Sequence, residues 1–139
     1  MRSWKASALA LTAIGVACIF PTDGCGCTPV PAIAVLFGRV ETPEGAAVEQ
    51  AAVFAYIGQG GGECGRHEAP DDQGQTQRDG TYRLDIAGPL EGESTCVLVR
   101  VQAPVGSLLL DAPDTAITLT LRYAPPVDSA RVDATLRAP

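Results

Sequence analysis

The single histidine of this chain lies in a segment that is rich in carboxylates. His67 is followed closely by Glu68, Asp71 and Asp72. An imidazole beside carboxylates can hold a divalent metal ion or move a proton near neutral pH. However, the acidic residues do not have the spacing of a calcium loop, and a solvated surface loop explains the same composition. We therefore predict no metal site here, and no cofactor for the chain.

The hydroxyl side chains lack the surroundings that activate a nucleophile. None of Ser94, Ser107 and Ser129 lies in a Gly-x-Ser-x-Gly context, and no glycine-rich loop precedes a helix that could hold a phosphate. A weak nucleophile needs an adjacent base or a lowered pKa, and no pattern in the chain supplies either. The sequence therefore predicts that the protein is not an enzyme.

Two aromatic residues of one predicted strand offer a possible ligand patch. Phe54 and Tyr56 share the face that points away from the alternating small residues Val53 and Ala55. Exposed aromatic rings of this kind can stack on a sugar or contact a peptide. The alternative is that a neighbouring strand, or the loop that carries Cys64, covers both rings.

The first residues have the features of an export signal. Arg2 and Lys5 precede an apolar run that ends at Ala17, which is too short to span a bilayer as a helix. We predict a signal peptide over residues 1–17. Ala17 and Cys18 resemble the end of a bacterial lipobox, so Cys18 is the predicted lipidation site; plain secretion or an uncleaved membrane segment are the alternatives.

Export places the remaining cysteines in a compartment that favours disulfides. With Cys18 lipidated, four cysteines remain and three connectivities are open. We predict a disulfide between Cys64, in a glycine-rich loop, and Cys96, whose side chain faces away from the predicted core. Cys25 and Cys27 could pair with each other or stay reduced, and their spacing is too short for a typical zinc site.

The body of the chain alternates apolar and polar residues with a period of two. The alternation recurs in short segments from Ile33 to the C-terminal tail, and Gly, Pro and Asp-Gly sequences separate them. We predict a hairpin through Asp79-Gly80 with a type I′ turn. The fold class that follows is all-β, an antiparallel Greek-key sandwich of seven or eight strands over residues 33–137. Residues 18–32, with several Pro and Gly, are predicted to form a flexible tether.

Composition limits the partners of this domain. The chain has 139 residues, enough for one domain, and a formal charge of −6. Nucleic-acid binding requires a basic surface, so no nucleic-acid partner is expected. Disorder is also excluded, because 46% of the residues are hydrophobic and 19% are charged.

Two segments carry a resemblance to a known family. Residues 37–53, FGRVETPEGAAVEQAAV, resemble the opening of carboxypeptidase regulatory-like domains, and residues 76–84, TQRDGTYRL, are similar to their second motif. A weaker third element is the predicted strand over residues 96–103. The resemblance covers about half of the chain and implies a transthyretin-like, carbohydrate-binding-like sandwich, with no catalytic residues to carry over. The cysteine-bearing insertion at residues 58–72 departs from the family pattern.

These features together predict an exported cell-envelope protein, anchored in the membrane through a lipid on Cys18, with secretion or a periplasmic location as alternatives. The expected role is that of a non-catalytic structural or protein-interaction module with an envelope protein as partner. The alternatives are a ligand-binding module for glycan or peptide, or an accessory subunit of a separate peptidase or receptor.

Overall fold

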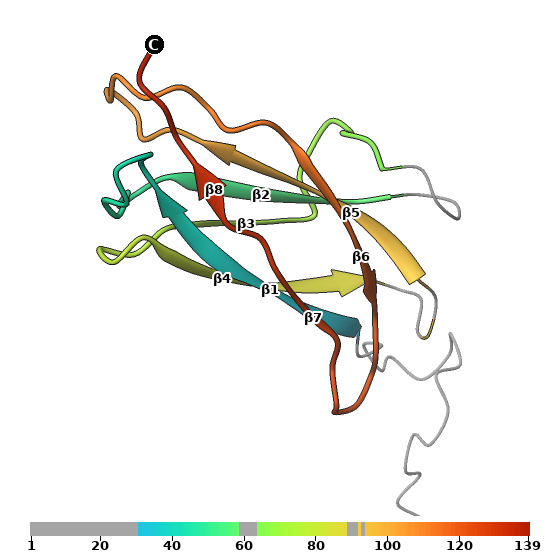
Figure 1. Ribbon diagram of the computed structural model, residues 1–139. Helices are drawn as coiled ribbons and strands as arrows, with labels where there is room; N and C mark the ends of the chain where they lie inside the picture. Colours follow the sequence, from blue (N-terminus) through green and yellow to red (C-terminus); the bar gives the residue numbers. More distant parts are fainter. Residues whose placement is uncertain (1–30, 59–63, 89–91, 93) are drawn as a thin grey trace, which may run out of the picture.

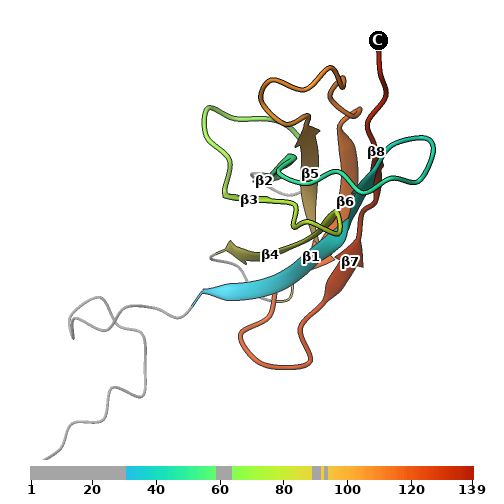
Figure 2. The ribbon, with the colours of Figure 1, turned by 90° about the vertical axis from the view of Figure 1, so that its left-hand side faces the viewer.

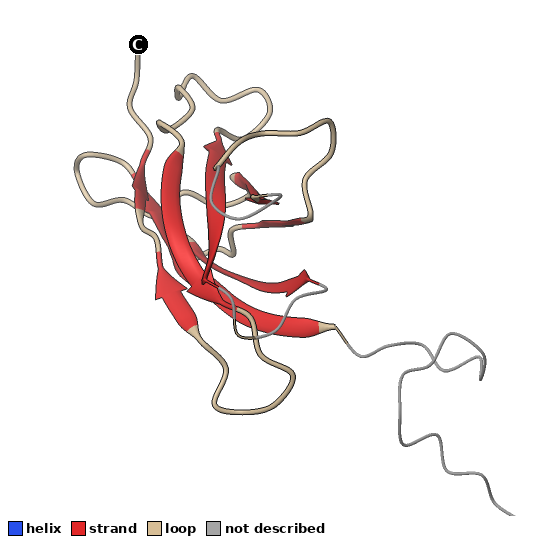
Figure 3. Cartoon of the chain, turned by 90° about the vertical axis from the view of Figure 1, so that its right-hand side faces the viewer, coloured by secondary structure: helices blue, strands red, loops and turns tan. Residues whose placement is uncertain are grey.

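The structure, a computed structural model, describes residues 31–58, 64–88, 92 and 94–139. These residues form strands and loops and no helix (Figure 3). One sheet has the order β4 (Thr81–Gly88), β1 (Ala32–Glu41) and β7 (Ser129–Arg131), and β8 (Ala134–Thr135) also pairs with β1. The other has the order β3 (Asp72–Gln75), β2 (Ala52–Ile57), β5 (Ser94–Gln102) and β6 (Thr115–Thr120).

The two sheets pack face to face, so the all-β sandwich predicted from the alternation is confirmed (Figure 1). β2 and β3 pair as a hairpin in one sheet, and β4 then returns to lie beside β1 in the other, as in a Greek key. β5 and β6 form the second hairpin. A view turned by 90° shows β1 running diagonally across the molecule beside β4, β7 and β8 (Figure 2).

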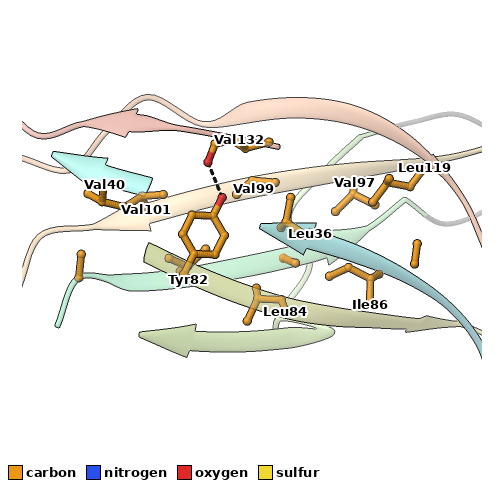
Figure 4. Close-up of a cluster of buried hydrophobic side chains, with 14 of the residues drawn as sticks. Leu36, Val40, Tyr82, Leu84, Ile86, Val97, Val99, Val101, Leu119 and Val132 are labelled. Atoms are coloured by element: carbon orange, nitrogen blue, oxygen red, sulfur yellow. Dashed lines mark hydrogen bonds between the residues drawn. The ribbon is translucent and has the colours of Figure 1, made fainter. Parts of the chain in front are cut away.

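The core is built from the inward positions of this alternation. Figure 4 shows side chains of both sheets meeting between the layers; the largest that are fully buried are Leu36, Val40, Val53, Ile86, Val97, Val99, Leu119, Leu121 and Leu136. Burying a side chain of this size stabilises the folded state by about 1.5–3 kcal/mol relative to exposing it. The period of two in the sequence therefore translates directly into the packing of the sandwich.

A close crossing of chain segments explains the glycine in the first motif. Gly38 lies in β1 where the carbonyl of Val132 and the ring of Tyr82 lie against its Cα, so an added Cβ would clash with that carbonyl. The Tyr82 hydroxyl donates a hydrogen bond to the same carbonyl oxygen at 2.6 Å. Burial, together with the nearby charge of Asp133, raises the pKa of Tyr82 well above its ordinary value, so this donor stays protonated.

The predicted sandwich is antiparallel except at its C-terminal end. β7 and β8 both run parallel to β1. After β6 ends at Thr120, the backbone N–H and C=O of Arg122 bond to Ile33 of β1, in the other sheet. The chain then turns and follows β1 in the same direction. Tyr123 is 48% exposed, because the strand alternation ends at this crossing.

The prediction of a type I′ hairpin at Asp79-Gly80 was wrong. The Gly80 N–H bonds to the Gln77 carbonyl and the Gln77 N–H to the Thr81 carbonyl, so a tight turn does form there. Gly80 has a φ of +79°, but Asp79 is not among the residues of positive φ, which a type I′ turn requires at both positions. The strands on the two sides also join different sheets, since β3 pairs with β2 and β4 pairs with β1.

Several predictions fall outside the described residues. The signal peptide, the lipidation site Cys18, Cys25 and Cys27 all belong to residues 1–30. The described part of the chain contains no helix with the length and hydropathy needed to span a membrane.

Candidate functional site

A disulfide fastens the loop after β2 to the outer face of the β3-β2-β5-β6 sheet. Cys64, near the start of the described part of this loop, is bonded to Cys96 in β5, with 5.3 Å between their Cα atoms. The pair is the one predicted from the sequence. Val97 on the next position of β5 is fully buried, so Cys96 lies on the opposite, outer face.

The disulfide brings the histidine of the loop over an aromatic ring of β2. The rings of Tyr56 and His67 meet edge to face, with centroids 5.6 Å apart. His67 Nε2 lies 2.8 Å from Asp71 Oδ2, and the same oxygen accepts a hydrogen bond from the Ile57 N–H at 2.6 Å. The imidazole and carboxylate therefore hold the loop against the end of β2.

An ion pair holds the same loop from its other side. Arg66 Nε lies 3.5 Å from Asp114 Oδ2, and Arg100 Nε of β5 lies 3.9 Å from Asp114 Oδ1. These side chains are partly exposed, so each ion pair adds little to stability by itself. Their effect is geometric, because they tie the loop to the segment that leads into β6.

Neither ring of the predicted ligand patch, Phe54 and Tyr56, is fully exposed. Tyr56 is only 9% exposed beneath the loop, while Phe54 is half-buried next to β3. Of the candidate acidic residues, Asp71 meets His67, whereas Asp72 accepts a hydrogen bond from the Gln73 N–H. No group of three or more potential metal ligands comes together among the described residues.

A second surface, which the sequence interpretation missed, lies in the loop between β5 and β6. Val105 is fully exposed, Leu108 is 84% exposed and Leu110 is 54% exposed. We call these three side chains the apolar loop. It lies at the same end of the molecule as the C-terminus, and β1 begins at the opposite end (Figure 1).

Local hydrogen bonds fix the apolar loop in this position. The Ser107 N–H bonds to the Pro104 carbonyl in a turn that includes Gly106, whose φ is +82°. The Leu110 N–H bonds to the Arg137 carbonyl near the C-terminus, and Asp111 Oδ1 accepts the Ala103 N–H at 2.9 Å. With both ends of the loop held, its apolar side chains point into solvent.

A groove with a volume of about 450 Å³ lies beside this loop. It separates the segment before β6 from the C-terminal strands. The lining residues are Leu110, Asp111, Ala112, Pro113, Thr115, Asp133, Ala134, Thr135 and Arg137. Its walls thus combine apolar side chains with two carboxylates and one guanidinium group.

The carboxylate of Asp133 on this groove also joins the C-terminal segment to β1. It accepts the Arg39 N–H at 2.9 Å and pairs with Arg131 Nε at 2.9 Å. Burial raises the pKa of Asp133, but the hydrogen bonds from Arg131 and the Arg39 backbone, with the charges of both arginines, outweigh it and lower the pKa below its ordinary value. Asp133 is therefore ionised at neutral pH.

The sequence does contain a signal for the apolar loop. Leu108, Leu109 and Leu110 follow a Pro-Val-Gly-Ser turn and do not alternate with polar residues. A consecutive apolar run that is too short for a helix is typical of a buried strand. The sequence pattern therefore does not predict that these side chains are exposed. The exposed fractions of Leu108 and Leu110 show that these two side chains lie at the surface, whereas Leu109 packs against the core.

The comparisons with known proteins identify no family for the chain. No protein-family model and no curated protein sequence matches the chain. Among solved structures, the chain is similar to a chlorocatechol 1,2-dioxygenase from Pseudomonas putida, with 13% identity and a TM-score of 0.46. The match covers 79% of this chain and 62% of the dioxygenase chain, which is less than two thirds of the latter. The resemblance to carboxypeptidase regulatory-like domains accordingly stays a prediction.

This comparison corrects one prediction. The sequence led us to expect that the protein is not an enzyme, but the similar solved structure belongs to an enzyme, so that expectation does not stand. At this TM-score the likeness assigns no reaction to the chain.

Proposed function

We propose that this protein is an exported, lipid-anchored module of the cell envelope that binds another envelope protein. The observation that carries the proposal is the apolar loop, in which Val105, Leu108 and Leu110 are exposed to solvent at one end of the sandwich. Exposed apolar side chains that gather beside a groove are typical of protein-binding surfaces. A hydrogen-bonded backbone presents these side chains before any partner binds, which lowers the entropic cost of association.

The position of the apolar loop supports binding at a distance from the membrane. The predicted anchor and tether precede residue 33, and the chain enters the sandwich at the start of β1. β1 has 10 residues. At about 3.3 Å per residue, the apolar loop lies roughly 30 Å beyond the end of the molecule that continues into the tether. A lipid anchor would hold that end at the membrane and leave the apolar loop accessible to a partner.

The test is a site-specific photo-crosslink in intact cells that export the full chain. A photoreactive amino acid replaces Leu108, and the matched control carries it at Arg83, an exposed position of β4. We expect a discrete adduct with one protein from position 108 and none from position 83. No adduct at position 108, or the same adducts from both positions, would contradict the proposal.

A further inference from the structure

The outer edge of β6 follows from the directions of its backbone groups. In an antiparallel strand the N–H and C=O of one residue point to the same side, and successive residues point to opposite sides. The Leu121 carbonyl accepts the Gly92 N–H just before β5. The backbone N–H and C=O groups of the odd-numbered residues of this segment therefore point toward β5. The backbone groups of the even-numbered residues point away from β5, toward the outer edge of the sheet.

Two residues of this edge have no backbone partner among the described residues. Arg122 is paired with Ile33, and the Thr120 N–H is bonded to Asp128 Oδ2 at 2.8 Å. Nothing in the described structure bonds to the outward N–H and C=O groups of Ala116 and Thr118. Both residues are exposed, so two donors and two acceptors are accessible in one row.

The sequence of β6 leaves this edge unprotected. Its residues, Thr-Ala-Ile-Thr-Leu-Thr, contain no charge and no proline, and Thr and Ile favour strands. By contrast, β4 at the edge of the other sheet carries the exposed pair Arg83 and Asp85. Charges, proline and short length are the usual protections against pairing with another chain, and β6 has none of them.

The groove lies at the end of β6 where Thr115 begins the strand. Its apolar lining residues include Leu110, Ala112 and Ala134. Asp133 is already paired with Arg131, whereas Asp111 has no ion-pair partner among the described residues. A strand added along the outer edge of β6 would continue past Thr115 to this groove. The site therefore suits an extended segment with apolar side chains and a basic residue.

We propose that an extended segment of a second protein pairs with β6 as a new edge strand, through the backbone of Ala116 and Thr118, and continues into the groove. This inference rests on the proposed function and names its partner by chemistry: alternating β-branched or apolar residues with a Lys or Arg near Asp111. The backbone bonds would supply affinity, and the groove would select the side chains.

The test selects phage-displayed random dodecapeptides on the purified mature protein and measures their affinity for two variants. Thr118→Pro removes one outward N–H without touching the ladder to β5. Asp85→Pro, the matched control, does the same at the outer edge of β4. We expect the selected peptides to bind Thr118→Pro at least about tenfold more weakly than wild type and to bind Asp85→Pro unchanged. Equal affinity for wild type and Thr118→Pro would overturn the proposal, as would the recovery of no binding peptide.

A second measurement uses only the wild-type chain, so it does not depend on how the proline variants fold. Each amide of one selected peptide is methylated in turn. Strand pairing requires that methylation weakens binding at every second position, because alternate amides face β6. A loss confined to one contiguous block, or no loss, contradicts strand addition.

Two further outcomes separate this inference from the proposed function. If the Leu108 crosslink persists in Thr118→Pro, the partner-binding function stands and strand addition is wrong. If wild type is a dimer by sedimentation and Thr118→Pro is a monomer, the occupant is a second copy of this chain and the proposal of a different protein is overturned.

Discussion

Gly38 is the residue on which the packing of the C-terminal segment on β1 depends. A Cβ at this position would enter the space of the Val132 carbonyl, which also accepts the hydrogen bond from Tyr82. The glycine of the first motif is therefore explained by the close approach of the C-terminal segment. Its backbone conformation does not require glycine, because its φ is not positive.

We expect Gly38→Ala to lower the free energy of unfolding by at least about 2 kcal/mol, because the clash is with backbone and the whole segment must shift. The measurement is urea denaturation followed by circular dichroism. Gly65→Ala is the control, since a Cβ there meets no atom, and it should change stability by less than about 0.5 kcal/mol. Equal stabilities for the two variants would show that the C-terminal segment does not lie against Gly38.

Asp133 makes the stability of this contact depend on pH. Its carboxylate is bonded in the folded state and its pKa is lowered, so it stabilises the fold at neutral pH. That contribution declines as the pH falls below about 4, where the carboxylate takes up a proton in the unfolded chain, and it is lost at the lower pH where the folded carboxylate is protonated. We expect Asp133→Asn to melt below wild type at pH 7 and the difference to shrink at pH 3. A difference that stays constant with pH would contradict the role of the charge.

At the scale of elements, the disulfide fixes the position of the loop after β2. It holds the loop over Tyr56, and the contact of His67 with Asp71 completes the cover. The loop therefore covers Tyr56, one of the two aromatic rings that this face could have offered to a ligand.

Replacing both Cys64 and Cys96 by alanine should lower stability by about 3–4 kcal/mol, because the bond closes a loop with a sequence separation of 32. The prediction is checked by denaturation of the oxidised wild type and the double variant. The single variant Cys64→Ala should behave like the double variant. If wild type loses no stability when reduced, the loop does not depend on the bond.

The strands show how far local pattern reaches. Alternation alone places Val53 and Ala55 on the face opposite Phe54 and Tyr56, and both are buried. The pattern could not show that β3 and β4 join different sheets across the Gln77–Gly80 turn. It also could not show that β7 and β8 run parallel to β1. Side-chain alternation has the same period in parallel and antiparallel strands.

On the scale of the whole molecule, the start of β1 and the apolar loop lie at opposite ends (Figure 1). The proposed function uses this separation, because it places the anchor at one end of the molecule and the partner at the other. The formal charge of −6 would favour a basic partner through long-range attraction.

The anchor itself is tested by Cys18→Ser. We expect wild type in the membrane fraction with a lipid mass on its N-terminal cysteine, and Cys18→Ser in the soluble fraction or unprocessed. Cell fractionation followed by mass spectrometry of the N-terminal peptide makes the comparison. Wild type recovered with an unmodified Cys18 would favour plain secretion instead.

The sequence alone determined the all-β class and the inward faces of most strands, because both follow from alternation. It predicted the pairing of Cys64 with Cys96 among three open connectivities, and the structure shows that bond. The tertiary structure decided which sheet each strand joins, the covering of Tyr56 and the exposure of the apolar loop. These depend on contacts between distant residues, such as the bond from the Arg39 N–H to Asp133, which are 94 positions apart. A period of two specifies which side chains are buried together, and only long-range pairing specifies what lies beside them.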